Sequence, residues 1–360
     1  MRIISQLFPN GKPVSTDIEA ARQPGSNMWE IPAWGHPLAL GVYPFFLTGN
    51  QRLIPAGTAF CISNFGVSMT GVCAIIGAAR RHSGDAFIAQ RDGLFTSQTM
   101  RTLGMALFHH QSLPGSKFSG HISTVEFIQA ASPTDAGYVF PQFQNGFLYL
   151  PLPLSFAIPR IGSRVVCVGF RDLSGPDAGL SLDDIKCGRI NLLDVYKHKL
   201  TAVEGRVTRI FAKRFADGFV DGPCFTIDAE IGHGMSGGPV FSENGYVCGI
   251  TSAAATDFFG KPASIISLLY PALVMNIRWG GQIGSLRISS KRRLTELIVQ
   301  GAVITDGSEN LVTMRQEGSE FLLGPGIHGE DADSIYDDLS SFQKGCYATR
   351  ESIDIYRLKI

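Results

Sequence analysis

Short apolar runs alternate with turn-forming residues through most of the chain. From Gly35 to about Pro271, runs rich in Val, Ile, Phe and Thr are separated by Gly, Pro, Asn and Ser; examples are "SRVVCVGF", "AVEGRVTRIFA" and "CFTIDAE". Runs of this kind at regular spacing are typical of strands in an all-β sandwich or barrel. Asn244-Gly245 in "SENGYV" lies between two such runs and predicts a tight hairpin.

Few segments favour a helix. The stretch "TGVCAIIGAARR" (70–81) predicts a turn or two, and "SLLYPALVMNI" (267–277) predicts a closing helix that Pro271 begins or kinks. The stretch "SSKRRLTELIVQGA" (289–302) predicts an amphipathic helix. Its apolar side would carry Leu294, Leu297 and Ile298.

Two changes in composition divide the chain into three parts. Residues 1–34 are Pro- and Gly-rich with weak periodicity, and they predict a loosely ordered N-terminal lead-in. The β-rich part covers residues 35–278. Residues 279–360 are acidic and turn-rich, which predicts a small α+β C-terminal appendage. We therefore expect an all-β domain with short additions at both ends.

The composition and the net charge limit the classes of partner that we expect for this protein. Hydrophobic residues make up 44% of the 360 residues, which is enough for a large core. Lys+Arg and Asp+Glu number 31 each, so net charge gives no reason to expect a nucleic acid or a membrane as partner. The chain has no signal-like N-terminal run and no stretch of about 18 apolar residues, so we expect a cytoplasmic protein.

The spacing of the cysteines does not indicate a metal centre. Seven cysteines lie far apart, and none falls in a CxxC or Cys/His arrangement with metal-ligand spacing. We interpret them as buried free thiols in a reducing compartment, and we expect neither a metal nor a cofactor.

One serine lies among glycines in "IGHGMSGGPVFSENGYVCGI" (231–250). A serine hydroxyl is a poor nucleophile unless a base takes its proton and donors stabilise the oxyanion. Glycines let the backbone turn sharply and aim N–H groups outward. The N–H groups of Gly234 and Ser236 are positioned along the chain to converge in this way.

Several stretches together resemble the trypsin-like serine peptidases, and in particular the HtrA-type branch. "IDAEIGHGMSGGPVFSENGYVCGI" is similar to the block around the catalytic serine of that branch. "LIPAGTAFCISNFGVSMTG", "PTDAGYVF" and "LPLPLSFAIPRIGSRVVCVGF" are similar to its upstream segments, so that the resemblance covers about residues 37–270. It implies a chymotrypsin-like double β-barrel, with barrel one at 35–147 and barrel two at 148–278. It also implies peptide-bond hydrolysis by acyl transfer on a peptide or protein substrate.

The resemblance assigns roles to three residues and finds one departure. Ser236 would be the nucleophile, the N–H groups of Gly234 and Ser236 the oxyanion hole, and Asp135 the carboxylate that orients the base. The family's histidine position falls in "SMTGVCAI" on Cys73. A thiol with an ordinary pKa is mostly protonated at pH 7 and accepts a proton poorly. We therefore expect a weak or inactive peptidase homologue.

A substrate pocket is implied next to the serine. In the family its base would lie near Glu230 and its wall along "GITSAAA", where small side chains leave room for a substrate side chain. Glu230 would favour basic side chains if it faced the pocket. The wall residues are Thr251, Ser252 and Ala253.

Other readings remain open. A relocated histidine could restore activity, although His82, His109, His110 and His121 are expected to be ordinary surface or loop residues. His233 lies in the serine turn and would point toward the substrate cleft. A pseudoprotease could still bind peptides through the cleft, because strand addition needs only backbone groups. A self-processing protein of a larger assembly is a third possibility.

The five residues Gly234–Gly238 also satisfy the G-x-S-x-G elbow of α/β-hydrolases. That elbow requires a helix after the serine and a histidine further along. Here a Pro, a short strand and a hairpin follow, and only His328 lies downstream. The pattern therefore favours the double barrel over an α/β-hydrolase.

Overall fold

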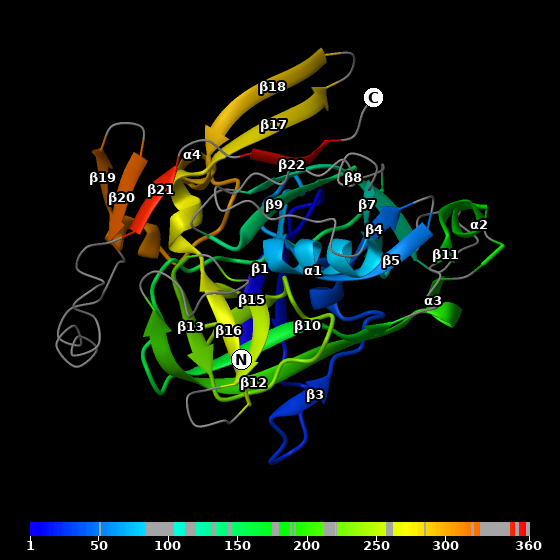
Figure 1. The fold of residues 1–360 in the computed structure, drawn as a ribbon, viewed down its shortest axis with the longest axis horizontal. Coiled ribbons are helices and arrows are strands. Elements are labelled where there is room, and N and C mark those ends of the chain that lie inside the picture. The colour runs from blue at the N-terminus through cyan, green and yellow to red at the C-terminus, as the bar shows by residue number, and fades with distance from the viewer. Residues whose placement is uncertain are drawn as a thin grey trace.

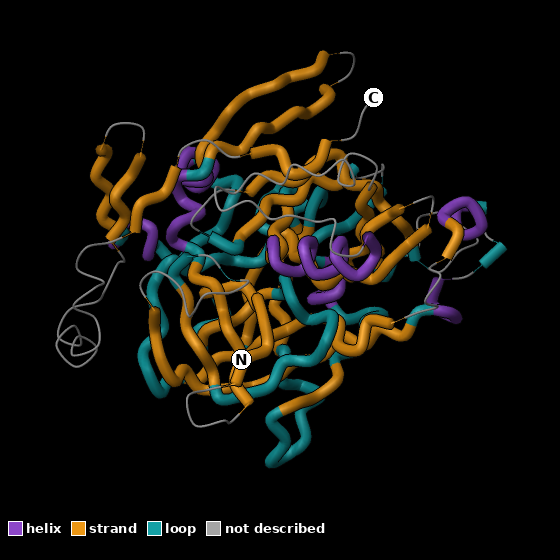
Figure 2. Tube along the Cα trace, viewed as in Figure 1, coloured by secondary structure: helices purple, strands orange, loops and turns teal. Residues whose placement is uncertain are grey.

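Two strand-built barrels and a few short helices make up the fold in the computed structural model (Figures 1 and 2). The residues that the structure describes are 1–49, 52–83, 104–111, 120–130, 134–142, 146–174, 180–187, 189–190, 192–211, 220, 222–256, 262–283, 286–317, 320–324, 346–349 and 353–357.

Barrel one is a closed antiparallel sheet in the order β5-β4-β7-β8-β9-β6, with β6 pairing back onto β5. Its strands are β4 (Val42–Gly49), β5 (Arg52–Cys61), β6 (Ser68–Gly71), β7 (Gly104–His109), β8 (His121–Ala130) and β9 (Ala136–Pro141). Alternate residues of β5 face opposite sides, as the period of a strand requires. Ala59 and Cys61 pack inside this barrel, and Phe60 packs in the core shared with barrel two.

Barrel two closes in the same way, in the order β10-β14-β15-β16-β13-β12 with β12 pairing onto β10. Its strands are β10 (Arg164–Ser174), β12 (Lys197–Phe211), β13 (Cys224–Ile227), β14 (Pro239–Ser242), β15 (Val247–Thr256) and β16 (Pro262–Leu268). The β14–β15 hairpin turns at Gly245, which has a φ of 81°. The predicted hairpin and the all-β, chymotrypsin-like double barrel are both confirmed.

The helices are short and peripheral. Helix α1 (Val72–Ser83) follows β6, packs on β5 and confirms the helix predicted at 70–81. The segment predicted as a closing helix contains a 3-10 turn, η4 (Tyr270–Val274). The third predicted helix is shorter than expected, because its first residues belong to a strand and α4 covers Leu294–Val299. The remaining short elements are η1 (Pro37–Leu40), β11 (Leu180–Ser181), α2 (Leu182–Lys186) and α3 (Leu192–Val195).

The N-terminal segment is not the loosely ordered lead-in that its Pro and Gly content predicts. Strands β1 (Arg2–Leu7) and β2 (Lys12–Asp17) form a hairpin, and β3 (Met28–Glu30) pairs with β12 of barrel two. Trp29 is buried, and its Nε1–H donates to the Ile18 carbonyl at 2.6 Å. The prediction was wrong because each strand is too short for its alternation to stand out between turns.

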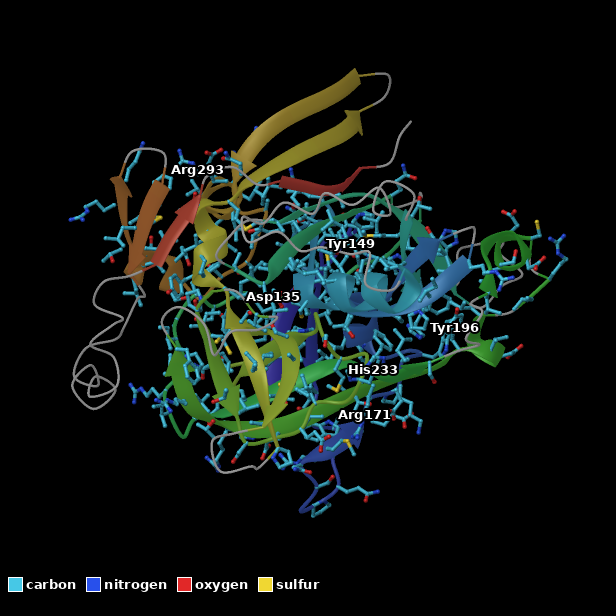
Figure 3. All side chains as sticks on the ribbon, viewed as in Figure 1. Asp135, Tyr149, Arg171, Tyr196, His233 and Arg293 are labelled. Carbon is cyan, nitrogen blue, oxygen red and sulfur yellow. The ribbon has the colours of Figure 1, made fainter. Side chains whose placement is uncertain are left out.

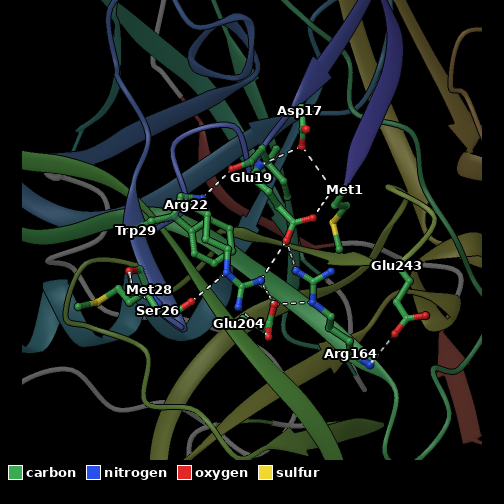
Figure 4. Close-up of polar contacts among 11 residues, drawn as sticks. Met1, Asp17, Glu19, Arg22, Ser26, Met28, Trp29, Arg164, Glu204 and Glu243 are labelled. Atoms are coloured by element: carbon green, nitrogen blue, oxygen red, sulfur yellow. Dashed lines mark hydrogen bonds and ion pairs between the residues drawn. The ribbon is translucent and has the colours of Figure 1, made fainter. Parts of the chain in front are cut away.

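An ion cluster fastens this segment to barrel two (Figure 4). Arg22 donates from Nη1 to Glu204 Oε2 at 2.5 Å and from Nη2 to Glu204 Oε1 at 3.2 Å. It also donates to Glu19 Oε1 at 3.1 Å. Arg164, on β10, donates to both Glu19 and Glu204, and the Met1 amine contacts Glu19.

The arginines lower the pKa of both glutamates. Burial raises the pKa of Glu19, but hydrogen bonds from Arg164, the Met1 amine and Arg22 outweigh it and bring the pKa to about 2. In Glu204 burial is likewise outweighed by hydrogen bonds from Arg22 and Arg164, so its pKa is also lowered. Folded pKa values below the unfolded value of 4.5 stabilise the fold above that pH, and this stabilisation is lost as pH falls toward 2.

We expect the cluster to add to acid sensitivity. Between about pH 5 and about pH 2, the free energy of unfolding should fall by about 1–2 kcal/mol more in the wild type than in Glu204→Gln. Urea unfolding at a series of pH values measures the difference. Glu30→Gln, which removes an exposed surface pair with Lys199, should run parallel to the wild type. Parallel curves for Glu204→Gln and the wild type would contradict the assignment.

After barrel two the described residues form mostly strands. A hairpin of β17 (Asn276–Ile283) and β18 (Leu286–Arg293) precedes α4, so the predicted boundary at residue 278 falls inside a strand. The turn η5 (Ser308–Leu311) precedes a three-stranded sheet of β19 (Thr313–Glu317), β20 (Glu320–Gly324) and β21 (Cys346–Thr349). Strand β22 (Ile353–Arg357) pairs with β8 of barrel one.

Six cysteines among the described side chains are free. Cys61, Cys167, Cys224 and Cys248 are buried, as predicted, whereas Cys187 is exposed. Across the same part of the chain, no helix has the length and apolar character needed to cross a membrane.

Candidate functional site

The loop that carries Ser236 connects β13 to β14 and is held by both barrels. Within barrel two, the Gly237 N–H donates to the Thr251 carbonyl at 2.6 Å, and the Thr251 N–H donates to the Gly238 carbonyl at 2.9 Å. From barrel one, the Thr58 N–H donates to the Ser236 carbonyl at 2.8 Å. Ser236 itself is half-buried. The serine thus lies where the two barrels meet.

The directions of two N–H groups on this loop follow from the hydrogen bonds that its carbonyls accept. The His233 carbonyl accepts from the Asp172 N–H at 2.8 Å, and the Met235 carbonyl accepts from the Gly238 N–H at 3.0 Å. In a trans peptide the following N–H points away from the carbonyl, so the Gly234 and Ser236 N–H groups point away from these partners. Among the described residues neither donates a backbone hydrogen bond. Two such donors are what an oxyanion hole requires.

Thr58 on β5 bridges the barrels and was missed as a functional residue. Its Oγ1 donates to the Gly234 carbonyl at 2.9 Å and accepts from the Phe170 N–H of β10 at 3.0 Å. The preceding residue, Gly57, could not carry a side chain, because a Cβ there would lie 2.4 Å from the Ser236 carbonyl oxygen. The adjacent Gly-Thr pair in "LIPAGTAFC" was the available signal.

Asp135 is buried just before β9 and is held through both carboxylate oxygens (Figure 3). Oδ1 accepts from the Cys73 N–H at 2.8 Å, and Oδ2 accepts from Ser252 Oγ at 2.7 Å. Its own carbonyl accepts from the Val72 N–H at 2.7 Å. The carboxylate therefore links the start of α1 in barrel one to β15 in barrel two.

Cys73 lies in the first turn of α1 and is half-buried. Its thiol donates to the Ser252 carbonyl at 3.0 Å. Burial, together with the adjacent charge of Asp135, raises the pKa of the Cys73 thiol well above its ordinary value. The thiol is therefore protonated at neutral pH and acts as a hydrogen-bond donor, whereas a general base must accept a proton.

Gly71 lies at the point where these groups approach the serine loop. A Cβ on Gly71 would lie 3.1 Å from Asp135 Oδ2, 3.2 Å from Cys73 Sγ and 3.3 Å from the Cα of Gly237, the residue after Ser236. The structure thus brings Cys73, Asp135 and the serine loop around one glycine.

The residues predicted for a substrate pocket have different environments. Glu230 is exposed, and Ala253 is half-buried against Val220, Cys224 and Ile265. The Thr251 side chain is fully buried, and its backbone holds the serine loop. The Ser252 hydroxyl donates a hydrogen bond to Asp135. A pocket formed by these four residues remains a prediction.

Two of the histidines expected at the surface are buried instead. His109 is fully buried, with its ring centroid 4.6 Å from that of Tyr43 and 4.7 Å from that of Phe147. Burial, and then the nearby His121 and His110, lower the pKa of His109 well below its ordinary value, so it stays neutral. His110 is also buried and stacks on Phe170, with ring centroids 5.3 Å apart. All residues of β7 from Met105 to His109 are buried, and a neutral histidine packs there as an aromatic ring.

The other candidate histidines are less buried or lie outside the described residues. His121, at the start of β8, is half-buried against Phe147, with ring centroids 4.9 Å apart. His233 has an exposed side chain beside Arg171 (Figure 3). The His82 side chain and all of His328 lie outside the described residues. In the described part of the chain, no group of three His, Cys, Asp or Glu residues could hold a metal ion.

The closed barrels and the serine loop between them define a chymotrypsin-like protein. The trypsin-like peptidase domain family matches residues 110–250, a span that includes Asp135 and Ser236 and does not reach Cys73. No curated protein sequence matches the chain.

Several solved protease structures are similar to this chain. The active form of the Rv3671c protease from M. tuberculosis is 15% identical over 66% of this chain and 82% of its own, with a TM-score of 0.38. The MamO protease domain from Magnetospirillum magneticum is 14% identical over 65% and 94%, with a TM-score of 0.39. Deg5 is 14% identical over 60% and 81%, with a TM-score of 0.39.

Proposed function

We propose that the chain is a trypsin-like serine peptidase homologue in which Ser236 is the nucleophile and Cys73 stands in place of the general base. Asp135 is the carboxylate that would orient that base, and the N–H groups of Gly234 and Ser236 form the oxyanion hole. The observation that carries this proposal is the contact of Asp135 with both the Cys73 N–H and the Ser252 hydroxyl, beside the serine loop.

The proposed activity is weak because Cys73, the residue that stands in place of the general base, does not accept the proton of Ser236. The Cys73 thiol donates to the Ser252 carbonyl, and its raised pKa keeps it protonated. Loss of a triad member lowers kcat by about 10⁴–10⁶, while the oxyanion hole and binding retain about 10³–10⁴ over water. An activated ester, which needs little help for its leaving group, would still be hydrolysed slowly.

The first test is serine labelling and ester hydrolysis. We expect slow labelling of the wild type by a fluorophosphonate probe and slow turnover of a p-nitrophenyl ester, with both lost in Ser236→Ala. The rate should show no inflection near pH 6.5, where a histidine base would titrate. Rapid labelling with such an inflection would instead favour a relocated histidine, and wild-type labelling that survives in Ser236→Ala would overturn the role of Ser236.

A peptide-binding pseudoprotease is the second candidate, and the protonated thiol favours it. A bound peptide would use the two free N–H groups and the backbone of a cleft-edge strand, none of which requires a base. Binding of a peptide aldehyde or product peptide that is equal in the wild type and Ser236→Ala, with no turnover of peptide substrates, would support this function.

The buried free thiols support our proposal of a reducing, cytoplasmic environment.

A further inference from the structure

Arg171, near the end of β10, lies against the serine loop. The Gly232 carbonyl accepts from the Met235 N–H at 3.2 Å, which closes a turn immediately before Ser236. Arg171 packs on this turn, because a Cβ on Gly232 would lie 2.4 Å from the arginine Cγ and 2.6 Å from its Nε. The exposed side chain of His233 lies beside Arg171 at the same turn (Figure 3). The glycine thus leaves the space that the arginine side chain occupies.

Within the described part of the chain, the Arg171 guanidinium has no strong hydrogen-bond acceptor. Nη1 contacts the thioether of Met28, which is a weak acceptor. Nε donates no hydrogen bond, and Asp172 Oδ2 lies 3.9 Å from it, beyond hydrogen-bond distance. The Arg171 side chain is 31% exposed. Because a guanidinium carries five N–H donors in one plane, Arg171 keeps donors for a carboxylate that approaches from solvent.

The basic residue nearest to Arg171 in the sheet is engaged differently. Lys199 of β12 is the cross-strand partner of Arg171. Its ammonium lies 3.2 Å from Glu30 Oε2, on β3. Lys199 therefore has a carboxylate partner of its own, and Arg171 is the cation of this pair that can accept another.

The residue after Arg171 fixes the position of β10 against the serine loop. Asp172 has a φ of 55°, and among the described residues it is the one residue other than glycine with a positive φ. Its N–H donates to the His233 carbonyl at 2.8 Å, next to the proposed oxyanion donor Gly234. A residue with a Cβ rarely adopts this conformation, and strain of this kind concentrates at functional sites.

The strand order places Arg171 and the predicted substrate pocket on opposite sides of the serine. Strand β14 begins three residues after Ser236 and lies between β10 and β15. The predicted pocket wall, residues 251–253, belongs to β15, whereas Arg171 belongs to β10. If the acyl part of a substrate occupies the pocket on the β15 side, the leaving group extends toward β10.

We propose that Arg171 determines specificity by binding a carboxylate on the leaving-group part of the substrate, C-terminal to the scissile bond. The inference rests on the function proposed for Ser236 and deepens it, because it names acidic peptides as the substrate class. A guanidinium binds a carboxylate through two parallel charge-assisted hydrogen bonds, which a neutral amide does not match. The thioether of Met28, a flexible side chain that is 42% exposed, would give way to this ligand.

Acyl transfer to added amines tests the proposal. After a p-nitrophenyl ester acylates Ser236, the amine of a dipeptide amide attacks the acyl carbon. A C–N bond forms, the C–O bond to Ser236 breaks, the amine loses one proton and Ser236 Oγ gains one. We expect glycyl-glutamate amide or glutamyl-glycine amide to be acylated about 10-fold more than its glutamine counterpart, and less so as salt rises. Mass spectrometry measures this ratio, which does not depend on how slowly the serine is acylated.

Three variants locate the preference. Arg171→Gln should bring the ratio close to 1. Gly232→Ala should do the same while keeping the charge, because its Cβ displaces the arginine side chain. Arg2→Gln removes an exposed arginine from β1 and should keep the wild-type ratio. A ratio of 1 in the wild type for both dipeptide pairs, or a preference that survives in Arg171→Gln, would overturn this proposal and leave the role of Ser236 standing.

Direct binding separates this proposal from the chemistry at Ser236. Absence of any acyl-enzyme would count against the role of Ser236 alone, and fluorescence anisotropy with Ser236→Ala then decides on Arg171. A fluorescein-labelled tetrapeptide with glutamate at its second residue should bind about 10-fold more tightly than the same peptide with glutamine. Equal affinities, or no binding of either peptide, would overturn the proposal.

Discussion

Cys73→His is expected to raise kcat/KM for a peptide ester about 10²–10⁴-fold, because it restores an imidazole at the position of the general base. The new imidazole would lie in the first turn of α1, where the backbone N–H of residue 73 already donates to Asp135 Oδ1. Its Nδ1–H could donate to the same buried carboxylate, and its Nε2 would be free to accept the Ser236 proton. Gly71, which has no Cβ, leaves space beside it.

The gain is measured by ester hydrolysis and fluorophosphonate labelling across a pH series. In Cys73→His the rate should rise with an apparent pKa near 6–7, as a histidine base requires. Cys73→Ala removes the thiol without adding a base and should match the wild type, and Cys73→His/Ser236→Ala should be inactive. A Cys73→His variant that is folded yet no faster than Cys73→Ala would refute the role given to residue 73.

Gly237→Ala is expected to destabilise the fold by about 3 kcal/mol or more and to abolish serine labelling. Gly237 has a φ of 88°, and a Cβ there would lie 2.2 Å from the Thr58 carbonyl oxygen and 2.3 Å from Thr70 Oγ1. The Thr70 hydroxyl donates to that same carbonyl at 2.6 Å, so neither atom can move without loss of a buried hydrogen bond.

Gly162→Ala separates the two causes of the destabilisation, which are the backbone strain at positive φ and the steric clash of the new Cβ. Gly162 has a φ of 84°, and a Cβ on it would meet nothing within 4 Å. It therefore reports the strain of the backbone conformation alone, which is about 1 kcal/mol. Urea unfolding of both variants gives the comparison. Equal losses for Gly237→Ala and Gly162→Ala would mean that close packing of the serine loop against barrel one contributes little.

Much of the barrel architecture could be predicted from the sequence, since alternating apolar runs and an Asn-Gly turn report local structure directly. The contact of Cys73 with Asp135 was also foreseeable, but only through family resemblance. Thr58 was not, because its role depends on a hydroxyl that reaches the loop of the other barrel. The adjacent Gly57-Thr58 pair is a local signal of close packing, but it does not indicate which distant carbonyl the hydroxyl will meet.

The errors have physical causes. The buried ring of His109 was expected at the surface, because histidine is polar in composition scales, yet a neutral imidazole packs among Tyr43 and Phe147 like an aromatic ring. The N-terminal strands were missed because each is short, and because the partner of β3 lies far along the chain in β12. Long-range pairing decides the structure of short segments whose own propensity is weak.

The hydrogen bonds between Thr58 and the serine loop have a consequence for folding during synthesis. Barrel one leaves the ribosome first, and it carries Cys73 and Asp135 but no serine loop. The loop follows in barrel two, and its carbonyls at Gly234 and Ser236 find their partners only when β5 is already in place. We therefore expect the serine loop to reach its final position only after both barrels have been synthesised.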